Sequence, residues 1–377
     1  MKNNNVALIV VLSLLSFFVM ADEGGSPVGN WLSDTKVRYP YEGSPIQWKF
    51  AHPAPPASLL PPIWQSGFDW LNKVTEQGMT IKQYGGGTLY GVKGGARAIR
   101  AGVADFGTCY SYYESSGFEL TNAFKVPYLL PENIYLAAKI IAELAPTYVK
   151  PEFERRGVYL GHLFPVSPMA LMSKTPIKKP ADLKGKKVAS FMRSSEAAEI
   201  IGYEEVQLPF PEIYTALQQG VIDAVIWSDM GFVPFKIYEQ AGFYTDINIA
   251  SGTIETCINK RSFNALPKGL KQAVYDTQQK LMMALVDKSV TFSQSAIPLY
   301  NKQGVEVIVL SPEEREEWKR AFEPIRKNWL KSCQDSGKEC LKLVDDINRL
   351  EEKYGGLSNQ ALMQSIIDNP VPGIIDF

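Results

Sequence analysis

Two stretches near the middle of the chain decide its fold: TPIKKPADLKGKKV at residues 175–188 and LPFPEIYTALQQGVIDA at residues 208–224. In the first, a short helical pattern at 180–184 leads into an apolar strand pattern at 187–191. In the second, a helical pattern at 211–219 leads into a strand pattern at 224–227. Helices that alternate with strands in this way are typical of α/β sheets.

The same alternation extends toward the N-terminus. It predicts strands and helices in turn at 46–51, 60–76, 79–84, 93–102 and 104–109. A further set of strands, at 158–160 and 169–172, precedes the two stretches and indicates a second lobe. Ligands of α/β sheets bind at the carboxyl ends of the strands, so we expect the loops at His52, Gly85 and Tyr110 to border one crevice.

Charge and composition exclude some classes of partner. The 377 residues include 39 Lys and Arg against 40 Asp and Glu, which gives a net charge of −1 at pH 7. Nucleic acids and anionic membrane surfaces attract proteins with a strong positive charge, so neither is an expected partner. An apolar content of 45% is ample for large buried cores.

The N-terminus has the pattern of an export signal. Lys2 precedes an apolar run at residues 6–20, which is shorter than the ~20 residues that cross a bilayer as a helix. We expect cleavage after Ala21 and a mature protein in the periplasm. A retained membrane anchor is the alternative, but acidic residues follow at 22–23 where a basic flank would stop transfer.

The chain has four cysteines, and an exported protein meets an oxidising compartment. Cys333 and Cys340 flank a polar segment between two helical patterns, which predicts a disulfide bond between them. Zinc is the weaker interpretation, because the chain has only two histidines and neither lies nearby in sequence. The sequence leaves open whether Cys109 and Cys257 pair or stay as buried thiols.

Patterns of catalytic residues are missing from the sequence. It contains no HExxH, G-x-S-x-G or Walker A motif. The glycines at 85–87 lack the lysine of a phosphate-binding loop and predict a tight turn. Hydrolase, metalloprotease and NTPase functions therefore lack their usual motifs, and we expect neither a metal nor a cofactor. An exported enzyme or sensor domain stays an alternative, and its cleft would gather titratable groups with shifted pKa values.

Together, the two opening stretches resemble the extracytoplasmic solute-binding proteins of tripartite ATP-independent periplasmic (TRAP) transporters, the C4-dicarboxylate-binding type. The resemblance extends from about Trp48 to Leu310 and includes KFAH at 49–52 and GVADF at 102–106. It implies an α/β, two-lobed periplasmic binding protein of the type II-like class, whose lobes are joined by crossing strands and a long bridging helix. It also implies one bound solute and membrane permease subunits as partners.

An apolar pattern with spacings of three and four predicts the bridging helix at about 267–297, where Pro298 should bend or end it. At 1.5 Å per residue this helix would be ~45 Å long, enough to cross both lobes. We expect the following division of the chain: signal peptide 1–21, lobe 1 at 46–165 and 252–300, lobe 2 at 166–251 and 301–328, and a helical C-terminal extension at 329–377.

The expected solute site departs from the family's pattern. The family holds a carboxylate with two arginines, and this chain has Met169 and Ala189 at those positions. The resemblance implies a pocket made of Pro53, Tyr110, Met169, Ala189, Phe210 and Trp227. His52 and Tyr113 are adjoining candidates for contact with the solute, and Asp229 is expected to cap a helix.

Without the two guanidinium groups, a buried carboxylate would lack its bidentate partners, at a cost of several kcal/mol. The expected pocket is apolar and aromatic, with the Tyr hydroxyl and the indole N–H as hydrogen-bonding groups. The sequence thus favours a neutral, largely apolar or aromatic solute. Two alternatives stay open: a periplasmic carrier of a lipid-like ligand, and a carboxylate-binding protein that uses Arg193 as a substitute anchor.

Overall fold

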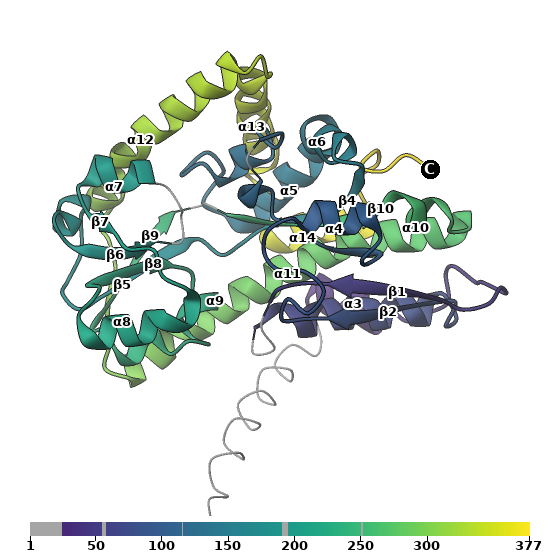
Figure 1. The fold of residues 1–377 in the computed structure, drawn as a ribbon, viewed down its shortest axis with the longest axis horizontal. Coiled ribbons are helices and arrows are strands. Elements are labelled where there is room, and N and C mark those ends of the chain that lie inside the picture. Colours follow the sequence, from purple (N-terminus) through teal and green to yellow (C-terminus); the bar gives the residue numbers. More distant parts are fainter. Residues whose placement is uncertain (1–24, 55–57, 115, 191–194, 250–251) are drawn as a thin grey trace, which may run out of the picture.

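A computed structural model describes residues 25–377, apart from 55–57, 115, 191–194 and 250–251. The expected signal peptide lies outside the described residues. Within them, none of the helices combines the length and the apolar character needed to span a membrane. Two α/β lobes, each with its own sheet, confirm the predicted fold class (Figure 1).

Lobe 1 contains a five-stranded sheet in the order β2-β1-β3-β10-β4. Its strands are β1 (Ile46–Ala51), β2 (Met79–Tyr84), β3 (Phe106–Thr108), β4 (Val158–Pro165) and β10 (Thr253–Asn259). Its helices are α2 (Pro27–Ser33), α3 (Leu60–Val74), α4 (Gly95–Ala101), η1 (Ser111–Tyr113), η2 (Asn122–Lys125), α5 (Ile134–Leu144), η3 (Ala145–Val149), α6 (Lys150–Arg155) and α10 (Lys260–Asn264). Strand β1 is parallel to β2 and β3, whereas β10 is antiparallel to β3 and β4.

Aromatic rings form the centre of lobe 1. The ring of Phe50 on β1 lies 4.3 Å from that of Phe106, 4.9 Å from Trp64 and 5.2 Å from Phe68 between centroids. Trp64 and Phe68 are four residues apart on α3, so they share the apolar face that this helix buries. The strand ends that carry the loops of the expected crevice therefore rest on a rigid core.

Lobe 2 contains a six-stranded sheet in the order β11-β9-β5-β8-β6-β7. Its strands are β5 (Met169–Ser173), β6 (Lys187–Ser190), β7 (Glu204–Glu205), β8 (Ala224–Trp227), β9 (Phe243–Ile249) and β11 (Glu306–Ile308). Its helices are η4 (Pro180–Leu183), α7 (Ser195–Ile201), η5 (Phe210–Glu212), α8 (Ile213–Gln219), α9 (Asp229–Phe232) and η6 (Ile237–Glu239). The helices and strands predicted from the two opening stretches are confirmed, with ends that differ from the prediction by at most two residues.

The chain passes from lobe 1 to lobe 2 between β4 and β5, and returns between β9 and β10. A third connection is α11 (Lys268–Lys302), a helix of 35 residues. At 1.5 Å per residue it is ~50 Å long. It contacts α3, α5 and β4 of lobe 1 and α9 and β11 of lobe 2, and in Figure 1 it runs obliquely from the lower left toward the right. This confirms the predicted bridging helix.

The expectation that Pro298 bends or ends α11 is wrong in its second part, since the helix continues to Lys302. Proline removes one N–H from the helix, so the carbonyl of Gln294 loses its usual partner. Gln294 is exposed, and water can satisfy that carbonyl. Beyond the proline, buried Tyr300 holds the last turn, because its hydroxyl donates a hydrogen bond to Asp229 at 2.7 Å.

Three helices form the C-terminal part of the chain: α12 (Pro312–Asp335), α13 (Cys340–Tyr354) and α14 (Asn359–Asp368). Helix α12 begins with a capping box, in which Ser311 Oγ accepts from the Glu314 N–H and the Glu314 carboxylate accepts from the Ser311 N–H. It contacts α7 of lobe 2, whereas α13 and α14 contact α5 of lobe 1. Helices α12 and α13 thus reach from one lobe to the other along the upper side of Figure 1.

The predicted bond between Cys333 and Cys340 is confirmed, and it joins the end of α12 to the start of α13 with 6.1 Å between the Cα atoms. Replacing both cysteines by serine should lower the free energy of unfolding by about 2 kcal/mol, because a short closed loop restricts the unfolded chain modestly. Urea unfolding measures this loss. Peptide mapping that finds both thiols free to alkylate in native, unreduced protein would contradict the bond itself.

Candidate functional site

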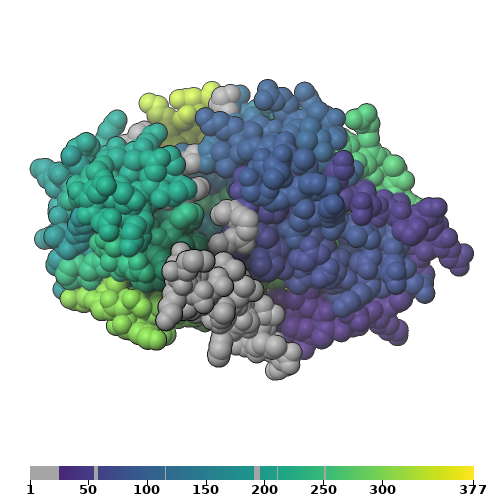
Figure 2. All heavy atoms as spheres, turned by 60° about the horizontal axis from the view of Figure 1, so that its bottom comes forward, coloured from purple at the N-terminus to yellow at the C-terminus, as the bar shows by residue number. Residues whose placement is uncertain are grey.

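A hollow of about 650 Å³, which we call the interlobe cleft, lies between the two lobes. Lobe 1 contributes Val92, Lys93, Tyr112 and Tyr113, and lobe 2 contributes Ala189, Ser190 and residues 205–209. Figure 2 shows lobe 2 in teal and lobe 1 in blue and purple as two separate masses. The volume falls within the ~300–1,000 Å³ that is usual for small-molecule sites.

The glycine-containing loop at 85–94 supplies part of the lobe 1 wall. Its first turn is fixed, because the Gly87 N–H donates to the His52 carbonyl at 3.1 Å. Its middle is fixed by Tyr90, whose hydroxyl lies 2.8 Å from the carbonyl oxygen of Ala51 at the end of β1. A side chain at Gly107 would obstruct this contact, since a Cβ there would lie 2.1 Å from the Tyr90 hydroxyl. The loop is therefore held against the strand ends.

A turn of aromatic residues at 110–113, which we call the tyrosine turn, forms the rest of this wall. The rings of Tyr110 and Tyr113 meet edge to face with centroids 6.0 Å apart, and those of Tyr112 and Tyr113 lie 5.8 Å apart. Burial raises the pKa of the Tyr110 hydroxyl, so this group stays neutral. Cys109, just before the turn, pairs with Cys257 on β10, which answers the question that the sequence left open.

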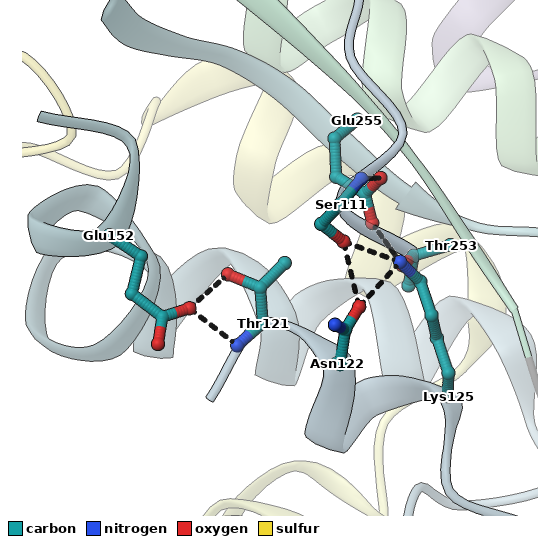
Figure 3. A network of polar contacts seen from close by, with 7 residues as sticks. All are labelled: Ser111, Thr121, Asn122, Lys125, Glu152, Thr253 and Glu255. Carbon is teal, nitrogen blue, oxygen red and sulfur yellow. Dashed lines mark hydrogen bonds and ion pairs between the residues drawn. The ribbon is translucent and has the colours of Figure 1, made fainter. Parts of the chain in front are cut away.

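A buried ion pair holds the tyrosine turn in place (Figure 3). The Lys125 ammonium lies 2.8 Å from a carboxylate oxygen of Glu255, whose side chain has no exposed surface. The ammonium also donates to Ser111 Oγ at 2.6 Å and to Asn122 Oδ1 at 3.0 Å. Glu255 in turn accepts from the Ser111 N–H at 3.1 Å. The turn is thereby fastened to β10, a strand that follows the crossing between the lobes.

Burial and pairing act against each other on the lysine of this ion pair. Removal from water lowers the pKa of Lys125, and the nearby carboxylate of Glu255 raises it. Thr253 adds a hydroxyl donor to Glu255, so the carboxylate is surrounded by donors. A buried charge of this kind persists only when its partners satisfy it.

Strand register builds the lobe 2 wall. Ala170 of β5 lies opposite Trp227 of β8, and Ser190 of β6 lies opposite Ile226. Because β6 and β8 are parallel and β5 runs the other way, the ends of β6 and β8 meet the start of β5 at one edge of the sheet. Met169, Ala189 and Trp227, three residues predicted for the site, therefore lie close to the same edge.

Trp227 is partly buried at this edge. Its indole stacks on Phe235 with 5.5 Å between ring centroids, and it covers Gly231, where a Cβ would lie 2.1 Å from the rings. Met169 is 7% exposed and packs in the lobe 2 core, whereas Ala189 lines the interlobe cleft.

The other predicted site residues are spread over several environments. Tyr113 lines the cleft with Ala189. His52 is buried against the rings of Phe50 and Trp64, and burial lowers its pKa, so the imidazole is neutral at pH 7. Pro53 follows it, half-buried. Arg193 and the side chain of Phe210 lie outside the part of the chain that the structure describes.

Four polar residues of the cleft were not predicted from the sequence: Lys93, Ser190, Glu205 and Gln207. Glu205 lies on β7, a strand of two residues that produces no strand pattern, and burial raises the pKa of its carboxyl group. Lys93 had a usable signal, since it follows the glycines after a predicted strand. Among the described residues neither Lys93 nor Glu205 makes an ion pair.

The expected capping role of Asp229 is wrong. Ser228 occupies the N-cap position of α9, and Asp229 is buried against α11. Burial raises the pKa of Asp229 from an ordinary 3.8 to about 6, although the Tyr300 hydroxyl donates to it. The folded state therefore binds this proton more tightly than the unfolded state does.

From this shift we predict a pH dependence. The favourable contribution of protonated Asp229 is complete below about pH 4 and is lost as the pH rises through 6, which amounts to roughly 3 kcal/mol for this group. Asp229→Asn keeps the acceptor for Tyr300 but cannot ionise, so its unfolding free energy should fall less over that interval. Urea unfolding between pH 4 and 7 measures the difference, and equal slopes for both proteins would contradict it.

The sequence matches the family model described as bacterial extracellular solute-binding protein, family 7, over residues 68–332. The ectoine/5-hydroxyectoine-binding periplasmic protein UehA of Ruegeria pomeroyi is 28% identical over 229 residues, which cover 58% of this chain and 66% of that protein. The 2,3-diketo-L-gulonate-binding periplasmic protein YiaO of Escherichia coli is 25% identical over 289 residues, which cover 74% and 85%.

Solved structures share the fold. A TRAP periplasmic solute-binding protein from Desulfovibrio salexigens has a TM-score of 0.75 and 24% identity, over 84% of this chain and 98% of that chain. A marine metagenome TRAP protein specific for aromatic acid ligands has a TM-score of 0.72 and 23% identity, over 83% and 99%.

Members of the matched family are extracytoplasmic transport receptors rather than enzymes. The family model matches more than half of the chain. The two lobes, crossing strands and bridging helix of this chain agree with the fold of the solved TRAP proteins. This chain therefore belongs to the bacterial extracellular solute-binding proteins of family 7, the solute receptors of TRAP transporters.

Proposed function

We propose that this protein closes its two lobes around a neutral, largely apolar or aromatic solute and delivers it to the membrane permease subunits of a TRAP transporter. Binding of a small solute follows from the family; the class of solute and the delivery step are the proposal. We also propose that export removes residues 1–21 and releases the protein into the periplasm.

The charges of the cleft carry the proposal. Met169 and Ala189 supply no guanidinium at the lobe 2 edge, and within the described lining the cation Lys93 is balanced by the carboxylate of Glu205. A dicarboxylate would bring two negative charges into a site whose described lining has no net charge. A solute without net charge meets no such cost.

The apolar part of the lining supports a ring or an apolar body. Two tyrosines, two valines, an alanine, a leucine and a proline line the cleft. Aromatic side chains offer broad faces for stacking, with hydroxyl groups for orientation. Two structural neighbours bind aromatic compounds, namely the metagenome protein specific for aromatic acids and one from Rhodoferax ferrireducens with copurified benzoate. Their solutes are acids, so the proposed difference here is the missing carboxylate partner.

Thermal-shift screening of the mature protein tests the solute class. Neutral aromatic or apolar compounds should raise the unfolding midpoint, since a ligand at a hundred times its Kd adds ~2.7 kcal/mol of stability. Small dicarboxylates and sugar acids should leave it unchanged. Micromolar binding of succinate would contradict the proposal, and its loss in Arg193→Gln would favour the alternative in which Arg193 anchors a carboxylate.

A further inference from the structure

We propose that lobe 1 carries a second ligand site, which binds the phosphate group of an anion. A hollow of about 360 Å³ lies beside the interlobe cleft and shares Tyr113 with it. Its lining, which we call the arginine hollow, consists of Gly94, Ala96, Arg97, Arg100, Tyr113, Glu114 and Arg156. The proposal concerns a different site from that of the transported solute.

The arginine hollow differs from the other hollows in its excess of positive charge. Three guanidinium groups face it against the single carboxylate of Glu114, and none of the three forms an ion pair within the described part of the chain. Another hollow, of about 600 Å³ beside α12, also has three cations, but four glutamates surround them there. Like charges gathered without counter-charges repel one another, and a bound anion would relieve that repulsion.

Glycines leave room for the guanidinium groups. A Cβ at Gly157 would lie 2.7 Å from Cδ of Arg100, so the Arg100 side chain lies directly along the backbone next to Arg156. A Cβ at Gly117 would lie 2.5 Å from Nη2 of Arg156. Both glycines have positive φ, +88° at 117 and +79° at 157, which favours glycine on backbone grounds as well. Larger residues at either position would crowd the two arginines.

Arg156 is held in place by contacts that do not neutralise its charge. Its guanidinium lies 5.3 Å from the ring centroid of Phe118 and donates to the carbonyl of Ser116. Arg97 and Arg100 come from α4, three residues apart, and are exposed. One fixed and two adaptable guanidinium groups offer forked N–H donors to the oxygens of a tetrahedral anion. A doubly charged phosphate also matches the excess of two positive charges in the lining.

Calorimetric titration of the mature protein with inorganic phosphate, in low-salt buffer and without transported solute, tests the site. We expect saturable binding that weakens as salt is added. Arg97→Gln combined with Arg100→Gln should weaken it at least tenfold, because hydrogen bonds to charged groups are lost. The matched control is Arg320→Gln with Arg326→Gln, two exposed arginines of the other hollow, which should bind phosphate like the unaltered protein.

Free phosphate and a phospholipid headgroup share this chemistry, and a second arm separates them. Cosedimentation with phosphatidylglycerol vesicles that depends on Arg97 and Arg100, without binding of free phosphate, assigns the site to a headgroup. Absence of both kinds of binding, or an equal loss in the control pair, overturns the proposal. Neither experiment uses the transported solute. A negative result here therefore does not contradict the proposed transport function, and failure of the transport proposal would not contradict the phosphate site.

Discussion

Replacing Lys125 by Met is expected to lower the free energy of unfolding by about 3–5 kcal/mol. The substitution leaves Glu255 without its cation, while its side chain stays fully buried. Ser111, which accepts from the ammonium and donates its N–H to Glu255, would lose one of these two contacts. Urea unfolding of both proteins at pH 7 measures the loss.

Two further variants separate charge from packing. Lys93→Met removes an exposed cation that forms no ion pair among the described residues, and should change stability by less than about 0.5 kcal/mol. Combining Lys125→Met with Glu255→Gln removes both charges and should recover part of the loss. A loss below about 1 kcal/mol for Lys125→Met alone would contradict the role of this ion pair.

Trp227→Ala is expected to weaken solute binding by ~30-fold or more, because truncation of an aromatic anchor typically costs 2 kcal/mol or more. The indole lies at the edge of the lobe 2 sheet where β6 and β8 end, near Ala189 of the cleft, although it is not itself among the residues that line the cleft. Trp227→Phe should retain part of the affinity. Calorimetry with a compound found by the thermal-shift screen measures both variants.

Trp329→Ala is the control for this prediction, because Trp329 is another partly buried tryptophan and lies on α12 against the lobe 1 core. It should bind the solute normally. If Trp227→Ala unfolds the protein or binds with unchanged affinity, Trp227 serves only to pack against Phe235 and Gly231.

The local pattern of apolar and polar residues predicted the α/β fold well. Strands β1, β2 and β8 have the predicted bounds, because apolar periodicity and the glycine and proline residues between elements were unambiguous there. The bridging helix was also predictable, but its end was not. Whether a helix continues beyond a proline depends on whether water can reach the carbonyl that has lost its N–H partner. The exposure of Gln294, which carries that carbonyl here, is not evident from the local sequence.

The ion pair and the disulfide bond that hold the tyrosine turn beside the cleft could not be predicted, because they join distant parts of the chain. Lys125 and Glu255 belong to different elements, and Cys109 pairs with Cys257 across 148 residues. The sheet order, which places β10 beside β3, brings Cys109 and Cys257 together. Glu205 was missed for another reason, since a strand of two residues is too short to show periodicity.

Native mass spectrometry of the mature protein, purified without denaturation, tests the proposed solute class most directly. A cleft closed between two lobes retains its solute when the solute is buried on both sides. We predict a bound, neutral, aromatic or apolar compound that is released on denaturation and is absent from Trp227→Ala. A dicarboxylate or a lipid bound to the unaltered protein would contradict the proposal.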